Sequence, residues 1–203
     1  MTQAQDGKDR WDERYREPGF AYGTEANEFL QSVVTRLPPG RVLSLAEGEG
    51  RNAVYLGKRG FQLTAVDQSA VGLAKASELA RMHGVDLSTE VADLKGYRIE
   101  PSSWEVVVSI FCHVPPSIRK RLYRAVVEGL VPGGALVLEA YTPQQLELGT
   151  GGPKDRDLLV DLSTLCRELS GLTFEIARET VREIHEGRYH DGAGAVVQVL
   201  AFR

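Results

Sequence analysis

Short apolar runs alternate along the chain with longer segments in which apolar residues recur every three or four positions. Short runs are typical of buried strands, and the longer periodic segments are typical of amphipathic helices. The pattern predicts strands at 41–45, 61–66, 88–92, 104–110 and 135–141, and helices at 51–59, 70–83, 118–129 and 157–170. Alternating strands and helices favour a mostly parallel α/β sheet with helices on both faces.

The pattern changes after residue 170, where two strand-like segments follow each other without a helix. Segments 172–181 and 195–202 flank a glycine-rich turn and predict a β-hairpin. We expect this hairpin to form an antiparallel edge of the sheet. Its turn contains Arg188, Tyr189 and His190. The favoured interpretation is that these three side chains are exposed and have no functional role.

The segment before the first strand predicts a helical cap. Residues 1–10 are polar and are expected to be disordered, whereas 11–15 and 25–37 favour short helices. Pro38-Pro39-Gly40 then ends the helical pattern. We therefore expect a single domain over residues 11–203, with its cap at 11–37.

Composition and charge narrow the function classes. The chain has 203 residues, of which 42% are hydrophobic, and carries 24 basic against 28 acidic residues, a net charge of −4. Because no block of like charge and no long apolar run occurs, we expect no nucleic-acid or membrane partner and a cytoplasmic location without a signal peptide. Cys112 and Cys166 are too few for a disulfide framework or a zinc site, so no metal is expected.

The loop after the strand at 41–45 carries the strongest chemical signal. Gly48 and Gly50 stand between this strand and a helix, where bare backbone and free helix N–H groups can face a ligand. Asp67 closes the next strand, from which its carboxylate can accept hydrogen bonds from ribose hydroxyls. Together these features predict a nucleoside-containing cofactor.

Several motifs occur in a specific order along the chain: Trp11-Asp12-x-Arg14-Tyr15, the 45–52 loop, Val66-Asp67, Ala92-Asp93-Leu94, the strand end at 104–113 and Val131-Pro132-Gly133-Gly134. With them, the chain resembles the class I S-adenosylmethionine-dependent methyltransferases, within them the small tellurite-resistance-type and thiol-type branch. The resemblance implies a Rossmann-like seven-stranded sheet with its last strand antiparallel. It also implies S-adenosylmethionine as cofactor, S-adenosylhomocysteine as product and a small-molecule acceptor such as tellurite, selenite or a thiol, in a monomer or weak homodimer.

The glycine loop departs from the family pattern at three positions. Ser44 replaces an acid, Ala46 replaces the first glycine, and Glu47 takes a position usually held by cysteine. Since the acid normally helps to hold the cofactor's ammonium group, Ser44 leaves that contact open. We hypothesise that Glu47 supplies the missing carboxylate.

The resemblance assigns further cofactor contacts by position. They are Tyr15, Gly48, Gly50, Asp67, Gln68, Asp93, Leu94, Phe111 and Cys112. Asp67 would bind the ribose and Asp93 the adenine amine, although each could instead be a cap or turn residue. Cys112 is more typical of a small buried packing residue.

Methyl transfer mainly requires the acceptor to be positioned in line with the methyl group. A general base is needed only where the acceptor must lose a proton. His113, which follows the strand at 104–110, is the candidate base, with packing as its alternative. Tyr141 and Tyr22 are the other candidate active-site residues, and the glycine-rich segment 149–156 could form a substrate lid.

Two other functions compete with the methyltransferase. Gly48-x-Gly50-x-x-Ala53 followed by Asp67 also fits the dinucleotide fingerprint of an NAD(P)-dependent oxidoreductase. Against this, about 40 residues precede the first strand, whereas a dinucleotide-binding domain usually begins with it. The altered loop at 44–47 also permits a cofactor-binding protein without turnover.

Overall fold

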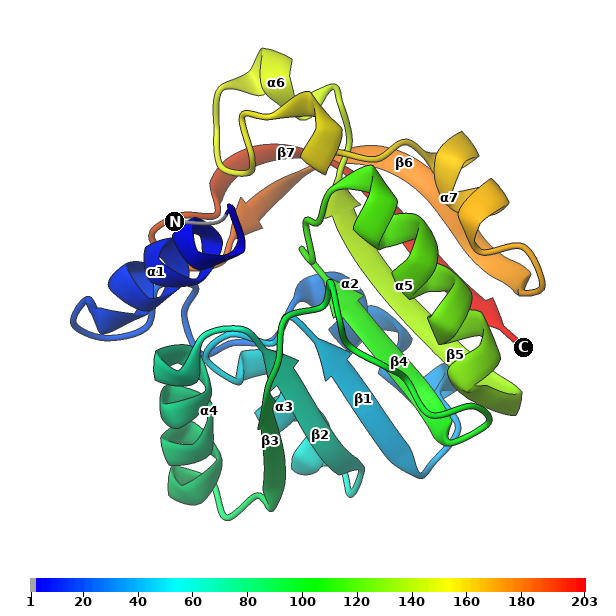
Figure 1. Cartoon of the computed structure of the whole chain (residues 1–203), viewed down its shortest axis with the longest axis horizontal. Helices are drawn as coiled ribbons and strands as arrows, with labels where there is room; N and C mark the ends of the chain where they lie inside the picture. Colours follow the sequence, from blue (N-terminus) through cyan, green and yellow to red (C-terminus); the bar gives the residue numbers. More distant parts are fainter. Residues whose placement is uncertain (1–2) are drawn as a thin grey trace.

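The computed structural model describes residues 3–203 and contains one seven-stranded sheet (Figure 1). Its strands are β1 (Arg41–Leu45), β2 (Gln62–Asp67), β3 (Leu87–Val91), β4 (Trp104–Ile110), β5 (Leu130–Tyr141), β6 (Thr173–His185) and β7 (Asp191–Phe202). They lie in the order β3-β2-β1-β4-β5-β7-β6, and β7 runs antiparallel to both of its neighbours. The predicted fold class, a mostly parallel sheet with an antiparallel hairpin, is confirmed.

Helices cover both faces of the sheet. They are α1 (Gln3–Arg16), α2 (Glu28–Val33), η1 (Val34–Arg36), α3 (Arg51–Gly57), α4 (Ala70–Met82), α5 (Pro116–Gly129), α6 (Gln145–Leu148), η2 (Arg156–Leu158) and α7 (Leu162–Glu168). One face packs against α2 and α3, with α4 packed on α3, and the other packs against α5 and α7. Within the part of the chain that the structure describes, no helix has the length and apolar character needed to cross a bilayer.

The central strands bury residues on both faces, with a period of two. Val106 and Val108 of β4 face α2 and α3, whereas Val107 between them faces α5. All three side chains are fully buried. A run of β-branched residues is therefore needed here, because a central parallel strand has no solvent-facing side.

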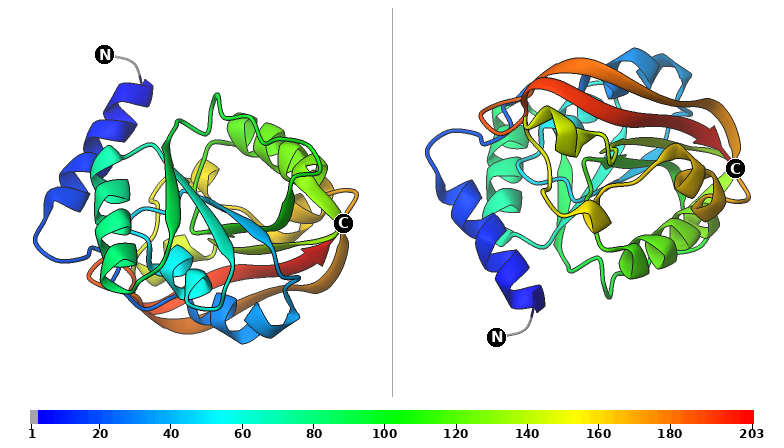
Figure 2. Two further views of the ribbon diagram at one scale, coloured as in Figure 1. Left: turned by 90° about the horizontal axis from the view of Figure 1, so that it is seen from below. Right: turned by 90° about the horizontal axis from the view of Figure 1, so that it is seen from above.

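The segment at 3–10 is helical in the structure, where the sequence analysis expected disorder. It forms the first part of α1, which packs along α4 in Figure 1 and in both views of Figure 2. Trp11 stacks on Tyr15 within the same helix, with ring centroids 5.6 Å apart. Contact with α4 and this aromatic pair stabilise a helix that its polar composition alone did not predict.

The predicted helix at 157–170 is shorter than expected. Only Leu162–Glu168 is α-helical, because the chain is extended just before it. The Val160 backbone N–H donates to the Tyr141 carbonyl at 3.1 Å, and the Asp161 side chain caps α7 by accepting from the Thr164 N–H at 2.7 Å. The apolar stripe was therefore misinterpreted in its first part, where it belongs to a buried extended segment.

The hairpin is longer than predicted because the expected turn glycines lie inside a strand. β7 begins at Asp191 and includes Gly192 and Gly194. A Cβ atom on Gly194 would collide with the Ile184 side chain on β6. Glycine is needed here for close side-chain packing, and the turn itself is confined to residues 186–190.

Candidate active site

Two glycines give the loop between β1 and α3 its shape. Gly48 and Gly50 adopt φ values of +66° and +92° in the left-handed region. A Cβ atom on Gly48 would lie 2.6 Å from the Tyr15 hydroxyl, and one on Gly50 would lie 2.7 Å from the Ala76 Cα atom. Both the conformation and the close packing therefore require glycine at these positions.

Ala46 and Phe111 adopt left-handed conformations that non-glycine residues rarely use. Their φ values are +51° and +52°, directly after the neighbouring central strands β1 and β4. Such conformations cost about 1–2 kcal/mol. The strain therefore lies at the carboxyl edge of the sheet, where open α/β sheets bind their ligands.

The start of α3 is capped by a carboxylate from the protein itself. Glu47 Oε1 accepts from the N–H groups of Asn52 and Ala53 at 3.1 and 2.9 Å, and its other oxygen accepts from the Ser44 hydroxyl. Burial raises the pKa of Glu47, while these hydrogen bonds act against that rise. The expectation of free helix N–H groups facing a ligand is therefore wrong for these two donors, because the buried Glu47 already satisfies them.

Asp67 joins the glycine loop to the start of α4. Its carboxylate accepts from the backbone N–H of Gly48 at 2.9 Å and of Ser69 at 2.8 Å. Burial raises the pKa of Asp67 to about 6, against the lowering effect of these two hydrogen bonds. The Ser69 hydroxyl caps α4 by accepting from Gly72 N–H at 3.0 Å.

Tyr15 places α1 over this loop. Its side chain is 5% exposed and packs against both Gly48 and Gly72. Burial is the first cause of the raised pKa of Tyr15, and the neighbouring Asp67 carboxylate adds to it. The cap predicted for this segment is therefore in contact with the loop, and Tyr15 lies within reach of the Asp67 charge.

The remaining predicted cofactor residues lie along the same edge of the sheet. Asp93 forms a turn in which its side chain accepts from Lys95 N–H at 2.8 Å, while Leu94 is buried and Gln68 is partly buried. Burial raises the pKa of the Cys112 thiol to about 12, which suits a packing residue and not a nucleophile. Contacts of Asp93 and Gln68 with an adenine stay predictions.

Five aromatic rings gather where β4 and β5 end and the hairpin turns. This aromatic cluster consists of Tyr22, Phe111, His113, Tyr141 and His190. Phe111 lies 4.7 Å from Tyr141 and 4.5 Å from His190 between ring centroids, and His113 stacks on Tyr141 at 5.6 Å. Tyr22 lies 4.6 Å from His190. The structure thus brings together all three residues predicted as catalytic, His113, Tyr22 and Tyr141.

His113 has one ring nitrogen that is bonded and one that is not. Nδ1 lies 3.0 Å from the Leu158 carbonyl, to which it can only donate. Nε2 is out of contact with solvent and has no hydrogen-bond partner. Burial lowers the pKa of His113 to about 4, so the ring is neutral at pH 7 and its Nε2 lone pair is free.

His190 is buried, although the sequence analysis favoured a surface position. Its residue exposure is 8%, because Tyr22, Phe111 and Tyr141 surround the ring. Nδ1 lies 3.9 Å from a carboxylate oxygen of Glu186 and has no closer polar partner. Burial lowers the pKa of His190, and the Glu186 carboxylate opposes this.

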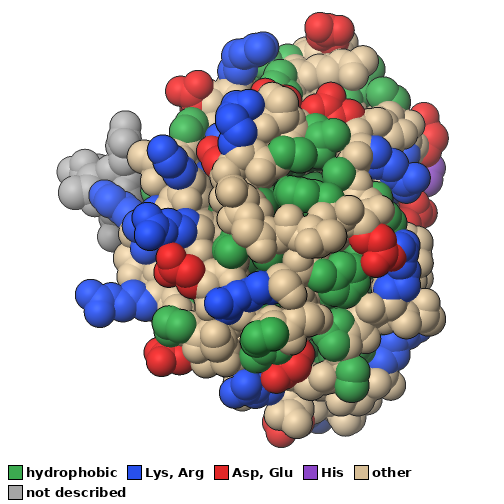
Figure 3. Space-filling model, turned by 90° about the vertical axis from the view of Figure 1, so that its right-hand side faces the viewer, with side chains coloured by type: hydrophobic (Ala, Val, Ile, Leu, Met, Phe, Trp, Pro, Cys, Tyr) green, Lys and Arg blue, Asp and Glu red, His purple; other side chains and the backbone are tan. Residues whose placement is uncertain are grey.

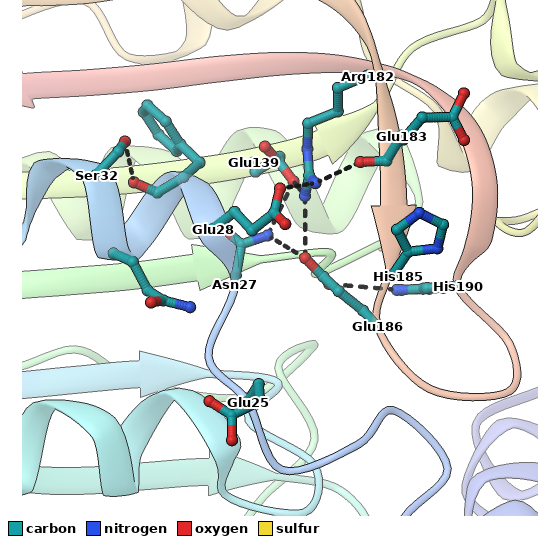
Figure 4. A network of polar contacts seen from close by, with 12 residues as sticks. Glu25, Asn27, Glu28, Ser32, Glu139, Arg182, Glu183, His185, Glu186 and His190 are labelled. Carbon is teal, nitrogen blue, oxygen red and sulfur yellow. Dashed lines mark hydrogen bonds and ion pairs between the residues drawn. The ribbon is translucent and has the colours of Figure 1, made fainter.

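A buried polar network holds the hairpin tip against the rest of the molecule (Figure 4). It consists of Asn27, Arg51, Glu139, Arg182, Glu186 and Gln198. Glu139, which is fully buried, accepts from Asn27 at 2.9 Å and from Arg182 at 2.6 Å. Glu186 accepts from Arg51 at 2.5 Å and also from Asn27 and Arg182. Burial would raise the pKa of Glu186, but His190 and the guanidinium groups outweigh it and lower the pKa.

Sequence reasoning missed this network. One signal was available, since Glu139 interrupts the apolar run of β5 and must be paired if the strand is buried. Its partners come from distant parts of the chain and carry no such signal. Among the described residues, no three His, Cys, Asp or Glu side chains are grouped as a metal site requires.

The predicted lid segment is anchored at its start. The Gln145 side chain donates to the Thr150 hydroxyl at 2.8 Å and to the Gly151 carbonyl at 3.0 Å. Gly152 packs against the Tyr141 ring, where a Cβ atom would come within 2.7 Å. The two cationic residues of the segment, Lys154 and Arg156, are exposed. The role of this segment as a lid stays a prediction.

Comparison with known proteins finds a family similar to part of the chain. Residues 42–134, from β1 into β5, match the family model of a methyltransferase domain. The matched segment contains Glu47, both loop glycines, Asp67 and His113. Over this segment, which holds the glycine loop and strands β1 to β4, the chain is similar to a methyltransferase domain. No curated protein matches the chain.

Solved structures show the same fold. TehB from Haemophilus influenzae matches with a TM-score of 0.72 and 18% identity, over 97% of this chain and 66% of TehB. Phosphoethanolamine N-methyltransferase 2 of Haemonchus contortus, in complex with S-adenosyl-L-methionine, matches with a TM-score of 0.68 and 18% identity, over 100% of this chain and 60% of that chain. The [4+2]-cyclase SpnF matches with a TM-score of 0.70 and 14% identity, over 100% of this chain and 97% of that chain. The chain thus has a fold that methyltransferases share with a cyclase, so the fold alone does not define the reaction.

Proposed function

We propose that the protein is an S-adenosylmethionine-dependent methyltransferase whose acceptor is a small-molecule nucleophile. The methyltransferase-domain match over residues 42–134 carries this proposal. The glycine-shaped loop, Asp67 and the aromatic cluster all lie at the carboxyl edge of the sheet, where such a domain would hold its cofactor and acceptor.

The chain's own residues fit this cofactor at its ribose and at its methionine part. Gly48 and Gly50 leave backbone bare of side chains, and Asp67 at the end of β2 would accept from the ribose hydroxyls. The bound cofactor would supply an activated methyl group on a cationic sulfonium. Glu47 places a buried carboxylate beside the loop, and its contact with the cofactor's ammonium group is part of the proposal.

Two observations favour this function over an NAD(P)-dependent oxidoreductase. Glu47 occupies the α3 N-terminus, where a dinucleotide-binding domain holds its pyrophosphate, and a buried carboxylate there would repel that anion. The sheet also has an antiparallel β7 inserted between β5 and β6, whereas the dinucleotide-binding sheet runs 3-2-1-4-5-6 in parallel.

The aromatic cluster is the proposed acceptor site. His113 Nε2 is a free acceptor for a proton, while Tyr22 and Tyr141 would hold the acceptor and exclude water. A small acceptor such as tellurite, selenite or a thiol is what the resemblance of the sequence implies, and the similar fold of TehB is compatible with it. Acidic and basic side chains are interspersed on the face shown in Figure 3, which offers no single-sign surface for a nucleic acid.

Thermal unfolding with different cofactors tests the proposal. S-adenosylmethionine at 100 times its dissociation constant should add about 2.7 kcal/mol, a shift of roughly 5–10 °C for a domain of this size. S-adenosylhomocysteine should act similarly, and NADH and NADPH should have no effect. A shift with a nicotinamide cofactor alone would reverse the assignment. Binding without methyl transfer to any acceptor in a panel of thiols and chalcogen oxyanions would point to a cofactor-binding protein without turnover.

A further inference from the structure

The ring of His190 is placed between a carboxylate and the proposed acceptor site. On one side, Nδ1 lies 3.9 Å from Glu186 (Figure 4). The ring also faces Phe111 and Tyr22, with centroids 4.5 and 4.6 Å away. A buried polar nitrogen without a hydrogen-bond partner is rare in proteins. The group nearest to Nδ1 is the Glu186 carboxylate, so a proton on the ring would face a negative charge.

Glu186 is held rigidly enough to orient that ring. Its carboxylate is fixed by Arg51 at the start of α3, by Asn27 before α2 and by Arg182 on β6. Arg51 directly follows Gly50, so the hairpin tip is tied to the proposed cofactor loop through one ion pair. A fixed carboxylate that faces an imidazole favours proton uptake by the ring, since its negative charge stabilises the imidazolium that forms.

The two histidines of the aromatic cluster, His113 and His190, differ in whether a carboxylate faces the ring. The bonded nitrogen of His113 faces a neutral carbonyl, that of Leu158. A proton taken up by His113 would create a charge without a facing carboxylate, whereas the same charge on His190 faces Glu186. The ionisable and charged groups around His190 are Glu186, Arg51 on α3, Arg14 on α1, Tyr22 after α1, Tyr141 on β5 and His113 after β4.

The lining of the cluster favours a neutral, polarisable acceptor. Phe111, Tyr22 and Tyr141 present ring faces and edges, against which sulfur packs favourably. The guanidinium groups of Arg51 and Arg182 are ion-paired with Glu186 and Glu139, and that of Arg14 donates to the Tyr22 hydroxyl at 2.8 Å. Because all three cations are already bonded, the lining favours a thiol over an oxyanion.

We propose that His190, which faces the Glu186 carboxylate, is the general base that removes the proton from a thiol acceptor. This rests on the proposed methyltransferase function. The S–H proton passes to His190, and the electron pair left on the thiol sulfur forms the new bond to the methyl carbon. The sulfonium C–S bond breaks and its electron pair stays on the cofactor sulfur. The imidazolium, facing Glu186, then returns its proton to water.

Two thiols that differ in ionisation test the role of His190. At pH 7 an alkanethiol is protonated and a nitro-substituted arenethiol is ionised, so only the first needs a base. His190→Asn should lower kcat/KM for the alkanethiol by about 10²–10⁴-fold, the usual contribution of a general base. It should leave the arenethiol within about threefold. Glu186→Gln should move the acidic limb of the alkanethiol pH profile to lower pH, because the imidazolium loses its counter-charge.

The control is His185→Asn on the same hairpin, whose side chain is 69% exposed and should not affect either thiol. An equal loss of both reactions in His190→Asn would mean a structural role and overturn the proposal. If this variant does not fold, the wild-type profiles decide: an acidic limb must be present for the alkanethiol and absent for the arenethiol.

Calorimetric measurement of S-adenosylmethionine binding distinguishes a failure of the role proposed for His190 from a failure of the proposed function. Binding without methylation of either thiol would overturn the acceptor class and the role of His190. Absence of binding would overturn the proposed function itself.

Discussion

The proposed cofactor loop and the hairpin tip are built in different ways. In the loop, Glu47 caps the helix that begins four residues after it, and Asp67 bonds to Gly48 across 19 positions. At the hairpin tip, Asn27 bonds to Glu139 and Glu186 across 112 and 159 positions. The loop uses backbone N–H donors that lie close in the sequence, whereas the tip uses buried side-chain charges from distant segments. A site can therefore have one half with a strong sequence signal and one half with almost none.

The largest effect should come from breaking the network at the hairpin tip. Arg182→Met leaves Glu139 fully buried without its cation, and removal of one partner of a buried pair costs about 3–5 kcal/mol. We expect a loss of this size in urea unfolding. The matched control is Arg124→Met, whose exposed pair with Glu128 should have little influence on the midpoint. A loss similar to that of the control would show that the network is not a stabilising unit.

In the cofactor loop, Asp67 should make the free energy of unfolding depend on pH, by somewhat less than the loss expected for Arg182→Met. The folded-state pKa of Asp67, about 6, lies above its usual value near 3.8. The folded state therefore binds the proton more tightly, and its contribution to stability is complete below pH 4 and lost as the pH rises through 6. Two pKa units correspond to about 3 kcal/mol.

Denaturant unfolding of wild type and Asp67→Asn from pH 4 to 7 measures this dependence. The difference in the free energy of unfolding, wild type minus variant, should fall over this range. A constant difference would contradict a raised pKa at Asp67. The asparagine variant keeps an acceptor for one of the two N–H donors and so limits other losses.

Removal of the Glu47 cap should have the next largest effect. Glu47→Ala leaves the N–H groups of Asn52 and Ala53 and the Ser44 hydroxyl without their acceptor, which should cost about 1–3 kcal/mol. Glu47→Gln keeps an oxygen for the two N–H groups and should lose less. Equal losses would mean that the negative charge, not the cap, is what stabilises the loop. Calorimetric S-adenosylmethionine binding by Glu47→Gln tests the ammonium contact separately.

The smallest expected effect is a gain. Ala46 has a φ of +51°, so Ala46→Gly should relieve about 1 kcal/mol of backbone strain. Ala53→Gly, inside α3, is the control and should lose about 1 kcal/mol. A loss at both positions would show that the methyl group of Ala46 contributes more through packing than it costs through strain.

Much of the fold was predictable because its signals are local. β1 and β4 have the predicted bounds, since both are short apolar runs between clear breaks. The helix predicted at 157–170 was too long, because an apolar stripe does not distinguish a helix from a buried extended segment such as Leu159–Val160. The glycines of β7 were interpreted as a turn because the side chains packed against them, Thr150 at Gly192 and Ile184 at Gly194, are not visible in the local pattern.

In the candidate site, too, residues with a local sequence signal were predicted, and residues placed by distant segments were not. The positions of Gly48, Gly50 and Asp67 at the loop follow from the strand–turn–helix pattern, although their contacts with a cofactor stay predictions. The capping role of Glu47 was missed because the position was compared with a family motif and not with a helix start. His190 could not be placed in the site from sequence, because its burial depends on Tyr22 and Phe111, which come from segments far from the hairpin.

The position of β7 has a consequence for the order in which the sheet assembles. β7 lies between β5 and β6, and β6 has no other partner in the sheet. β6 therefore joins the sheet only together with β7, and until then the edge of β5 is unpaired. Pairings of such long range close late, because they must overcome the entropy of a long loop. A refolding intermediate should thus contain β1–β5 with an open edge, a species prone to self-association, and the site at the hairpin tip should form only in the final step.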